Sequence, residues 1–437
     1  MKQLIIQTGL IDKLSHDGKG IAHWQDKVVF VEGGLPGEQV QWQIIQRRSN
    51  FDVARTTQIL VPSSDRTIPC CPHYEQCGGC LLQHLLPKKQ LQFKQDVLNE
   101  LFEHQLGISQ LPWVAPITSS STNYRRRARI GVKYLRKKER LVIGFHERRG
   151  RYLADINSCI VLRDNIGQRI DELRQLLSAL TVFDQIAQLE ITVDDYASHV
   201  VIRALAAITS KDRELLIDFS KRTGVWLYLQ QGGLSSIQPL LNNQPLPSYH
   251  LPDFNLQLQF SPASFIQING AVNRQLVNRV VQWLDPKPED KIIDLYCGIG
   301  NFTLPLARSG AQLLGIEGEK TAVNQANANA ILNGITNVEF LALDLSAPEQ
   351  LNALSAKLAS ANKLLLDPPR TGAWEVISLL ATLTTAPQQI VYVSCNPATL
   401  VRDCTAVVTA GYNIVSIGVA DMYPHTAHIE TIVLLSR

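Results

Sequence analysis

The chain has 437 residues, which is enough for about three domains of ordinary size. Hydrophobic residues make up 45% of it, charged residues 19%, and the formal net charge is only +3. These proportions are typical of a globular chain and exclude a disordered protein, a collagen-like repeat and a coiled coil. No apolar run reaches the roughly 18 residues of a membrane span, and the first residues lack the apolar run of a secretory signal. We therefore expect a cytoplasmic protein with no membrane partner.

Short apolar runs separated by glycine turns fill the first sixty residues. Several strands in so short a segment predict a small OB-like β-barrel. A polar linker follows at residues 62–69, and residues 88–102 carry an apolar stripe with the period of a helix.

Eight cysteines in a chain without a secretory signal favour metal or catalytic thiols over disulfides. Cys71, Cys77 and Cys80 form a C-x5-C-x2-C run, and three thiols so close can converge on one soft metal centre. The isolated Cys159 is the candidate fourth ligand. The absence of a second close pair favours an iron–sulfur cluster over zinc, while a zinc knuckle and four structural thiols remain alternatives. Cys70, beside Cys71, has no place in this set.

A basic block occupies residues 125–151, where twelve Lys and Arg face only two Glu, for a local net charge of +10. Such a block in a nearly neutral chain is typical of phosphate binding. Aromatic residues lie within or beside it, among them Tyr124, Tyr134 and Phe145, and they favour RNA because unpaired bases stack on such side chains. A solvated charged surface is the plainer alternative.

From residue 291 onward, apolar strands alternate with helical segments, which predicts a doubly wound α/β sheet. The first strand ends in a turn that contains Gly298 and Gly300, where the backbone can approach a ligand. Glu317 ends the second strand, where a carboxylate accepts the hydroxyls of a ribose. Asp344 ends the third. The third glycine of a dinucleotide site is missing, so the pattern favours adenosylmethionine and a class I methyltransferase pocket.

Two side chains follow the fourth and fifth strands, Asp367 and Cys395, and both are expected to face the ligand region. A thiol beside a methyl donor has a specific use, because thiolate addition at carbon 6 of a pyrimidine makes carbon 5 nucleophilic. A base must then remove the carbon-5 proton. Glu430, just before the final strand, is the candidate base, with His425 and His428 as alternatives. A small buried core residue is the alternative reading of Cys395.

Together these motifs resemble the RNA uracil-C5-methyltransferase family over nearly the whole chain. The resemblance includes an RNA-binding barrel of the TRAM type and is carried by residues 16–22, 71–80, 265–269, 294–301, 367–370, 394–397 and 425–430. It is closest to the branch that acts on 23S ribosomal RNA, because that branch combines a TRAM module with a four-iron cluster.

The resemblance implies a role for each candidate residue. Cys395 would be the nucleophile and Glu430 the base. The pocket for S-adenosyl-L-methionine and uracil would be lined by Gln267, Tyr296, Asn301, Glu317, Asp344 and Asp367, beside the glycines of the turn. A [4Fe-4S] cluster would be held by Cys71, Cys77, Cys80 and Cys159. The family also suggests that residues near 83–116 fold back onto the catalytic domain.

We therefore expect three domains. Residues 1–60 form the TRAM barrel, residues 61–82 and 117–262 a central α+β iron–sulfur and RNA-binding domain, and residues 83–116 and 263–437 the methyltransferase domain. The predicted activity is methylation of carbon 5 of a flipped uridine in 23S ribosomal RNA by a monomer. The alternatives are another RNA uridine, including one in tRNA, a non-catalytic RNA-binding assembly factor, and an amino-group methyltransferase.

Overall fold

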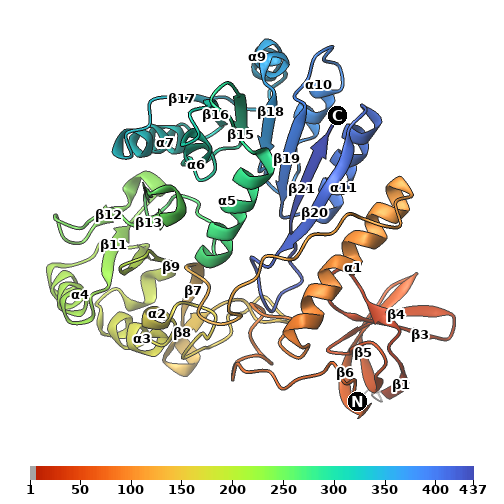
Figure 1. The fold of residues 1–437 in the computed structure, drawn as a ribbon. Helices are drawn as coiled ribbons and strands as arrows, with labels where there is room; N and C mark the ends of the chain where they lie inside the picture. The colour runs from red at the N-terminus through yellow and green to blue at the C-terminus, as the bar shows by residue number, and fades with distance from the viewer. Residues whose placement is uncertain (1–5) are drawn as a thin grey trace.

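Three sheet-based units make up the molecule in the computed structural model, which describes residues 6–437 apart from the side chains of residues 164 and 165. A small barrel at the N-terminal end, a central sheet and a larger C-terminal sheet lie side by side (Figure 1). Within the described residues, no helix combines the length and the apolar character that crossing a bilayer requires.

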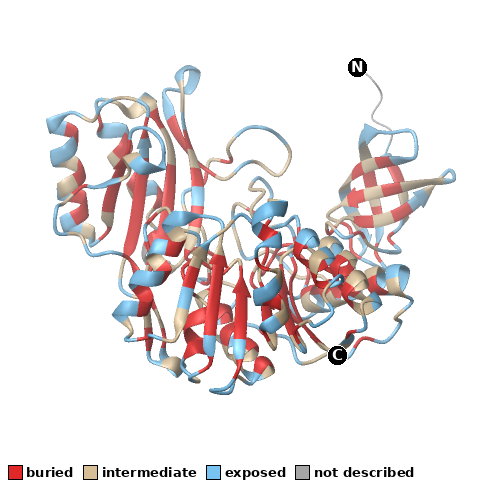
Figure 2. Cartoon of the chain, turned by 90° about the horizontal axis from the view of Figure 1, so that it is seen from above, coloured by how far each residue is buried: buried red, intermediate tan, exposed pale blue. Residues whose placement is uncertain are grey.

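The N-terminal unit is a six-stranded barrel with its own apolar centre (Figure 2). Its strands are β1 (Ile6–Leu10), β2 (Lys13–Leu14), β3 (Gly20–Trp24), β4 (Lys27–Glu32), β5 (Gln39–Arg47) and β6 (Phe51–Val61). They pair in the order β1-β5-β6-β4-β3-β2. Trp42 is fully buried at the centre, and its indole N–H donates to Gln7 Oε1 at 3.0 Å, so the one polar atom of this ring is satisfied. The predicted barrel is confirmed.

The central unit is a six-stranded sheet in the order β12-β11-β10-β9-β7-β8. Its strands are β7 (Arg127–Leu135), β8 (Arg140–Gly144), β9 (Ile186–Val193), β10 (Ser198–Ala204), β11 (Trp226–Gln230) and β12 (Gln238–Pro239). The helices of this unit are α2 (Asp164–Gly167), α3 (Ile170–Ala179) and α4 (Ser210–Thr223). The described residues also contain short 3-10 helices at Arg136–Lys138, Phe183–Gln185, Leu234–Ser236 and Pro252–Phe254.

The C-terminal unit is a seven-stranded sheet in the order β17-β16-β15-β18-β19-β21-β20. Its strands are β15 (Lys291–Leu295), β16 (Gln312–Glu317), β17 (Val338–Ala342), β18 (Lys363–Leu366), β19 (Gln389–Ser394), β20 (Asn413–Ala420) and β21 (Glu430–Ser436). The first five in the spatial order are parallel, whereas β21 runs antiparallel to both of its neighbours. The strand order reverses beside β15, and ligands of doubly wound sheets bind at such a reversal.

Helices cover both faces of this sheet. They are α1 (Pro87–Leu106), α5 (Gly270–Leu284), α6 (Thr303–Ala307), α7 (Lys320–Leu332), α8 (Pro348–Asn352), α9 (Ser355–Ser360), α10 (Trp374–Leu380) and α11 (Pro397–Thr409). Neighbouring residues of β15 point to opposite faces, because side chains alternate along a strand. Ile292 therefore packs with α5, α6 and α7, and Ile293 packs with α1 and the helices from α8 to α11.

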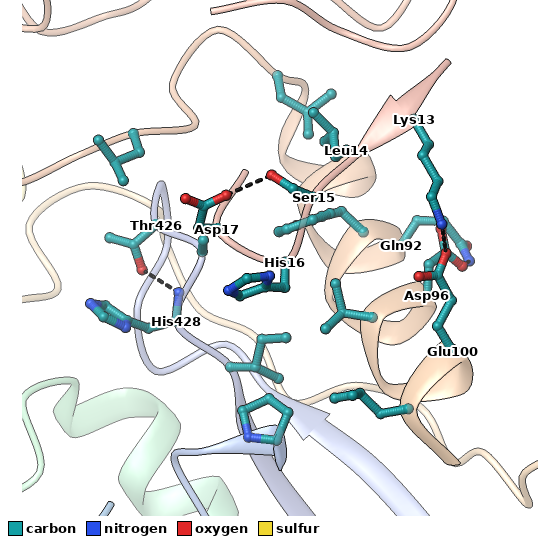
Figure 3. Close-up of a pocket in the computed structure, with 18 of the residues that line it drawn as sticks. Lys13, Leu14, Ser15, His16, Asp17, Gln92, Asp96, Glu100, Thr426 and His428 are labelled. Carbon is teal, nitrogen blue, oxygen red and sulfur yellow. Dashed lines mark hydrogen bonds and ion pairs between the residues drawn. The ribbon is translucent and has the colours of Figure 1, made fainter. Parts of the chain in front are cut away.

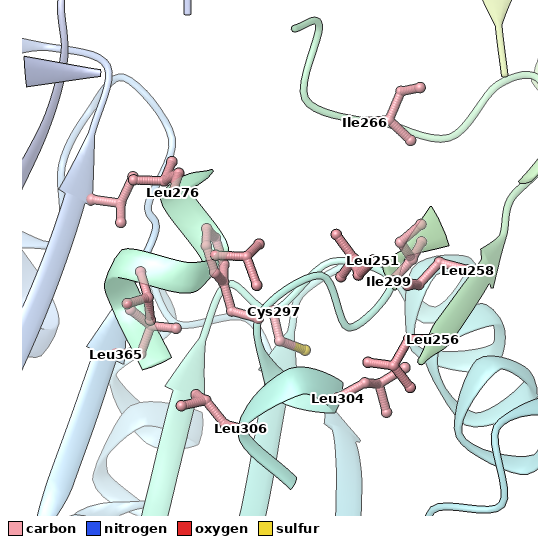
Figure 4. Close-up of a cluster of buried hydrophobic side chains, with 14 of the residues drawn as sticks. Leu251, Leu256, Leu258, Ile266, Leu276, Cys297, Ile299, Leu304, Leu306 and Leu365 are labelled. Carbon is pink, nitrogen blue, oxygen red and sulfur yellow. The ribbon is translucent and has the colours of Figure 1, made fainter. Parts of the chain in front are cut away.

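Two segments outside the C-terminal run of the chain pack against this sheet. Helix α1 buries Leu98 and Phe102 in the cluster that also contains Leu400 of α11. The hairpin of β13 (Ser248–Leu251) and β14 (Leu256–Gln259) lies in the same buried cluster as α6 (Figure 4). Residues 248–262, which we expected in the central domain, thus share a core with the C-terminal sheet.

Candidate active site

The candidate site lies where four parallel strands end. Tyr296 follows β15, Glu317 ends β16, Asp367 follows β18 and Cys395 follows β19, and parallel strands bring their carboxyl ends to one edge. Glu430 reaches the same edge from the opposite direction, because β21 is antiparallel.

The register between β19 and β21 brings the Cys395 thiol close to the Glu430 carboxyl. Ser394 of β19 pairs directly with Thr431 of β21. Cys395 directly follows Ser394, and Glu430 directly precedes Thr431. Both residues therefore lie at the point where the pairing between β19 and β21 ends. Partners across an antiparallel pair have Cβ atoms about 5 Å apart. The register thereby brings together two side chains that are 35 positions apart in the sequence.

Burial and like charges raise the pKa of three groups at this edge, Cys395, Glu430 and Asp367. The pKa of the Cys395 thiol rises to about 11, first because of burial and then because Glu430 and Asp367 lie near it. Burial, with Asp367 beside it, raises the pKa of Glu430 well above the ordinary value, and its side chain is 3% exposed. Burial and the neighbouring Glu317 raise the pKa of Asp367 to about 7. All three groups therefore hold their protons more tightly than exposed groups of the same kind do.

One cation acts against these shifts. The exposed Arg370 lowers the pKa of both Cys395 and Glu430, although burial outweighs it in each case. Asn396 Nδ2 donates to the Arg370 carbonyl at 2.8 Å, and the guanidinium lies 3.3 Å from His428 Nδ1. Arg370 lies within residues 367–370, which carry the family resemblance, but the sequence pattern predicted no role for it. The signal for a role in the site was its position three residues after Asp367, at the end of β18.

The glycine turn after β15 has a backbone that only special residues adopt easily. Tyr296 has φ +65°, Gly298 +55° and Gly300 +91°. The Gly298 N–H donates to Glu317 Oε2 at 3.1 Å, and the Glu319 N–H donates to Oε1 at 3.0 Å. The turn therefore holds the Glu317 carboxylate at the end of β16, beside the backbone that was expected to approach a ligand.

The side chain of Asn301 is engaged in a polar network. Its Oδ1 accepts from the Tyr249 hydroxyl at 2.8 Å and from Asn273 Nδ2 at 2.9 Å, and its Nδ2 donates to Asn273 Oδ1 at 3.0 Å. These bonds tie the turn to the β13–β14 hairpin and to α5. The Asn301 side chain thus stabilises the glycine turn through these hydrogen bonds.

Asp344 and Gln267 lie on either side of the turn. The exposed Asp344 accepts from the Ser346 N–H at 2.9 Å and its hydroxyl at 2.6 Å, and these bonds lower the pKa of the carboxyl. Gln267 is buried in the loop before α5, and its Nε2 lies 3.4 Å from Asp367 Oδ2. Gln267 and Asp367 therefore face each other, while Asp344 remains accessible from solvent.

The two histidines differ from Glu430 in their surroundings. His425 is 4% exposed and lies against α1, where Gln90 Nε2 is 3.3 Å from its Nδ1. Burial lowers the pKa of both His425 and His428. Of the three base candidates, Glu430 is the one whose charge affects the Cys395 thiol.

The site opens into a groove of about 1260 Å³. Figure 3 shows its walls, which are the barrel loop at residues 13–17, helix α1, and the loop that carries Thr426 and His428. Cys395 and Asn396 line the same groove. Lys13 Nζ forms an ion pair with Glu100 Oε1 at 2.9 Å across it, so the barrel contacts α1 directly.

The basic residues of the block at 125–151 differ in their exposure to solvent. Arg126 is buried, with its guanidinium 4.5 Å from the Tyr249 ring centre and its Nε donating to the Gln267 carbonyl at 2.9 Å. Arg129 pairs with Glu190 at 2.8 Å. Exposed cations concentrate instead at the turn between β7 and β8, at Arg136, Lys137, Lys138 and Arg140. Assigning the whole block to phosphate contacts was therefore too broad, because one of its arginines is part of the core.

The four thiols of the cysteine pattern line one small cavity. Cys71, Cys77, Cys80 and Cys159 share its wall with Tyr74, Phe145 and neighbouring apolar atoms. Burial is the first cause that raises the pKa of each thiol, and for Cys80 the value rises to about 12. Cys70 is exposed and is not part of this wall. Among residues 6–437, no group of three or more His, Cys, Asp or Glu side chains is arranged as a ready metal-ion site.

Comparisons with known proteins agree with this architecture. A family model described as tRNA (Uracil-5-)-methyltransferase matches residues 248–437, and a TRAM domain model matches residues 6–54. The chain is 40% identical to the 23S rRNA (uracil(1939)-C(5))-methyltransferase RlmD of Dechloromonas aromatica, over 97% of this chain and 98% of that protein. It is 42% identical to the enzyme of the same name from Aromatoleum aromaticum, over 98% and 99%.

A solved structure shares the fold over nearly the whole chain. It is the crystal structure of Pyrococcus abyssi tRNA (uracil-54, C5)-methyltransferase in complex with S-adenosyl-L-homocysteine, with a TM-score of 0.75 and 22% identity. The alignment covers 98% of this chain and 100% of that one. The sheet order and the matched models define a class I methyltransferase domain that follows a TRAM domain. The chain belongs to the RlmD family of RNA uracil-C5-methyltransferases, so the resemblance seen in the sequence is confirmed.

Proposed function

We propose that this protein transfers a methyl group from S-adenosyl-L-methionine to carbon 5 of a uridine in 23S ribosomal RNA. The relatives that match it end to end carry this substrate in their names. The observation that carries the chemistry is the pairing of Ser394 with Thr431, because it sets Cys395 and Glu430 side by side at the mouth of a groove. Since ribosomal RNA is its substrate, we place the activity in the cytoplasm.

The residues around the glycine turn fit the methyl donor. The Glu317 carboxylate, held by the Gly298 N–H, suits the two hydroxyls of a ribose. The exposed Asp344 carboxylate, two residues after β17, is available to a polar edge of the adenine. S-adenosyl-L-methionine supplies a methyl group on a sulfonium, which leaves as a neutral thioether.

In the first step, the Cys395 thiol releases its proton to water in the groove, and the sulfur bonds to carbon 6 of the uracil. The electron pair of the carbon 5–carbon 6 double bond moves toward the carbonyl oxygen at carbon 4, and carbon 5 becomes the nucleophile that takes the methyl group. Arg370 favours the thiolate, since its charge lowers the pKa of Cys395. Asp367, in contact with Gln267, is placed to hydrogen-bond the edge of the ring.

In the second step, Glu430 removes the remaining proton from carbon 5. The electron pair of that bond restores the double bond, the bond between sulfur and carbon 6 breaks, and Cys395 leaves as a thiolate. The raised pKa of Glu430 makes its carboxylate a stronger base than an exposed one. The product is 5-methyluridine.

We also propose that Cys71, Cys77, Cys80 and Cys159 hold a [4Fe-4S] cluster. The convergence of four thiols on one largely apolar cavity supports this, because thiolates are the ligands of such clusters. The cluster would cross-link the loop before α1 to the central sheet.

The RNA is proposed to lie in the groove between the barrel, α1 and the strand ends. Cys395 lines this groove and is half-buried, and a uracil that is stacked in a duplex does not reach it, so we expect the target uridine to flip out. Exposed cations at the turn between β7 and β8 would contact phosphates. We expect a monomer, since the groove and all the named catalytic residues lie within one chain.

The test is methylation of 23S ribosomal RNA transcripts by the purified protein with labelled S-adenosyl-L-methionine, followed by mass mapping of the product. We expect 5-methyluridine at one position, and a covalent protein–RNA complex when 5-fluorouridine replaces uridine. Methylation on an amino group, or RNA binding without any methyl transfer, contradicts the proposal. The cluster is tested separately by the iron and sulfide content of protein purified without oxygen.

A further inference from the structure

The loop that leads to Glu430 has a strained residue at its centre. We call residues 421–429 the base loop. His425 within it has φ +65°, a conformation that is uncommon for a residue with a side chain. Such strain persists only where the surroundings hold the residue firmly, and it concentrates at functional sites.

The bonds that hold His425 come from two adjoining segments: the loop at residues 70–86, which we call the cysteine loop, and the first turn of α1 that follows it. Its carbonyl accepts from the Leu81 N–H at 2.8 Å and the Leu82 N–H at 2.9 Å. Its own N–H donates to Gln90 Oε1 at 2.9 Å, and Gln90 Nε2 lies 3.3 Å from its ring Nδ1. The backbone of the strained residue is thereby bound on both its donor and its acceptor side.

Gln90 joins this loop to the cysteine loop. It is 3% exposed, and its Nε2 also donates to the Leu82 carbonyl at 2.9 Å and the Leu85 carbonyl at 2.8 Å. Both polar atoms of the amide are therefore used, and a buried amide with all its bonds made keeps its position. Leu81 directly follows Cys80, one of the four thiols of the cavity.

A second anchor lies one helical turn farther along α1. Lys94 is fully buried, and its Nζ donates to Asp421 Oδ1 at 2.7 Å and to the Tyr423 carbonyl at 3.1 Å. Burial lowers the pKa of Lys94, and Asp421 opposes that shift. The Tyr124 hydroxyl donates to the Pro424 carbonyl at 3.1 Å. The base loop is thus fixed over four of its first five residues.

Cys395 depends on different contacts. It lies between β19 and α11, where Asn396 caps the helix by accepting from the Ala398 N–H at 3.2 Å and binds the Arg370 carbonyl. None of these bonds involves Gln90. The base loop approaches Arg370 through His428, whose Nδ1 lies 3.3 Å from the guanidinium, whereas Gln90 binds His425. We therefore expect a change at Gln90 to disturb the approach to Glu430 first and to leave the backbone around Cys395 in place.

We propose that Gln90 is a positioning residue for the base step, acting through His425 on Glu430, and that it links the cysteine loop to that step. The inference rests on the proposed function. Loosening the base loop slows proton removal from carbon 5, whereas addition of the Cys395 sulfur and methyl transfer to carbon 5 are unaffected.

The test compares two RNA substrates with full-length protein purified without oxygen. On uridine RNA, turnover needs the base. On 5-fluorouridine RNA, the covalent complex forms by thiol addition and methyl transfer, and no carbon-5 proton is present. For Gln90→Ala we expect kcat on uridine RNA to fall about tenfold or more, with KM and the trapping rate within about twofold of the unaltered protein. Gln90→Glu keeps the acceptor for the His425 N–H and should lose less.

The matched control is Gln105→Ala, the same change at an exposed position of α1 that makes no contact with the groove. It should leave both rates unchanged. Equal turnover for Gln90→Ala and Gln105→Ala overturns the proposal, and so does a parallel fall of trapping and turnover. If Gln90→Ala does not fold, the same comparison is made with Gln90→Glu. Inactive unaltered protein refutes the proposed function instead.

The link to the cysteine loop has its own readout, which does not depend on activity. Cys80→Ser should speed amide hydrogen exchange in residues 424–429, as Gln90→Ala does. Combining the two changes should add little, because they act through one contact. Unaltered exchange in Cys80→Ser overturns the link.

Discussion

Thiols gather at two places in this molecule, and their surroundings differ. In the cysteine cavity, Cys71, Cys77, Cys80 and Cys159 have one another, aromatic rings, apolar atoms and Arg125 as neighbours. At the strand ends, Cys395 has Glu430 and Asp367 beside it, an arginine nearby, and an open groove in front. Burial raises the pKa in both places.

The difference shows that a raised thiol pKa does not by itself define a role. Four thiols converging in an enclosed cavity can share a soft metal centre, because each can be deprotonated by the metal that it binds. A single thiol beside a carboxyl and a groove can add to a substrate and be released again. The groups around each sulfur therefore determine whether it is suited to bind a metal centre or to react with a substrate.

The largest expected effect is that of Cys395→Ala, which should lower methylation by at least about 10⁴-fold, because the nucleophile is lost. RNA binding should change less than about twofold, and no complex should form on 5-fluorouridine RNA. Cys70→Ala is the control, since this thiol is exposed and outside the cavity. Substantial turnover by Cys395→Ala would contradict the nucleophilic role of Cys395, and with it the contrast between this thiol and the four thiols of the cavity.

Glu430→Gln should lower turnover by about 10²- to 10⁴-fold, the usual contribution of a general base. Thiol addition and methyl transfer remain possible, so a covalent methylated complex should accumulate on ordinary uridine RNA. Gel electrophoresis under denaturing conditions measures it. Turnover lost without any accumulated complex would show that Glu430 acts before methyl transfer.

The pH profile sharpens the same contrast. Cys395 and Glu430 must both be deprotonated to work, and the pKa of each lies above its ordinary value. Activity should therefore fall as pH falls. The ratio kcat/KM covers the steps through methyl transfer, in which only the Cys395 thiol must lose its proton, so it should rise by about tenfold per pH unit from pH 6.5 to 8.5. Single-turnover rates across that range provide the measurement. A flat profile would mean that another group sets the reactive state.

The smallest expected effects concern the cavity. Cys80→Ser should lower the free energy of unfolding by about 2 kcal/mol or more, because one ligand of the proposed cross-link is removed. Cys70→Ser should change it by less than about 0.5 kcal/mol, since an exposed side chain loses little. Denaturant unfolding without oxygen measures both. Equal stability of the two variants would contradict the proposal that the thiols of the cavity bind a cluster that cross-links the chain.

Local pattern was sufficient for much of the fold and the site. The glycine turn, the acid at the end of β16 and the thiol before a proline could each be found within one segment, because strand ends and turns have local chemistry. The helix predicted at residues 88–102 also matches α1, since Leu98 and Phe102 follow its apolar stripe. The long loop from residue 421 carried no such period.

Several site residues had no local signal. Gln90 and Lys94 lie among the polar residues of a helix, and only the packing of α1 against the base loop buries them. Arg126 belongs to a run of arginines that looks exposed in the sequence, yet its guanidinium lies against Tyr249. Burial of a long polar side chain depends on partners that are distant in the chain, so periodicity does not show it.

The sequence by itself determined which chemical groups this protein has and which strands or turns carry them, because turn residues and apolar periods act over a few positions. Only the tertiary structure decided which groups meet. The antiparallel entry of β21 brings Glu430 to Cys395, and the base loop brings His425 to Gln90 across 335 positions. Strand pairing and helix docking join residues far apart in the chain, and their register is set by the whole packed core.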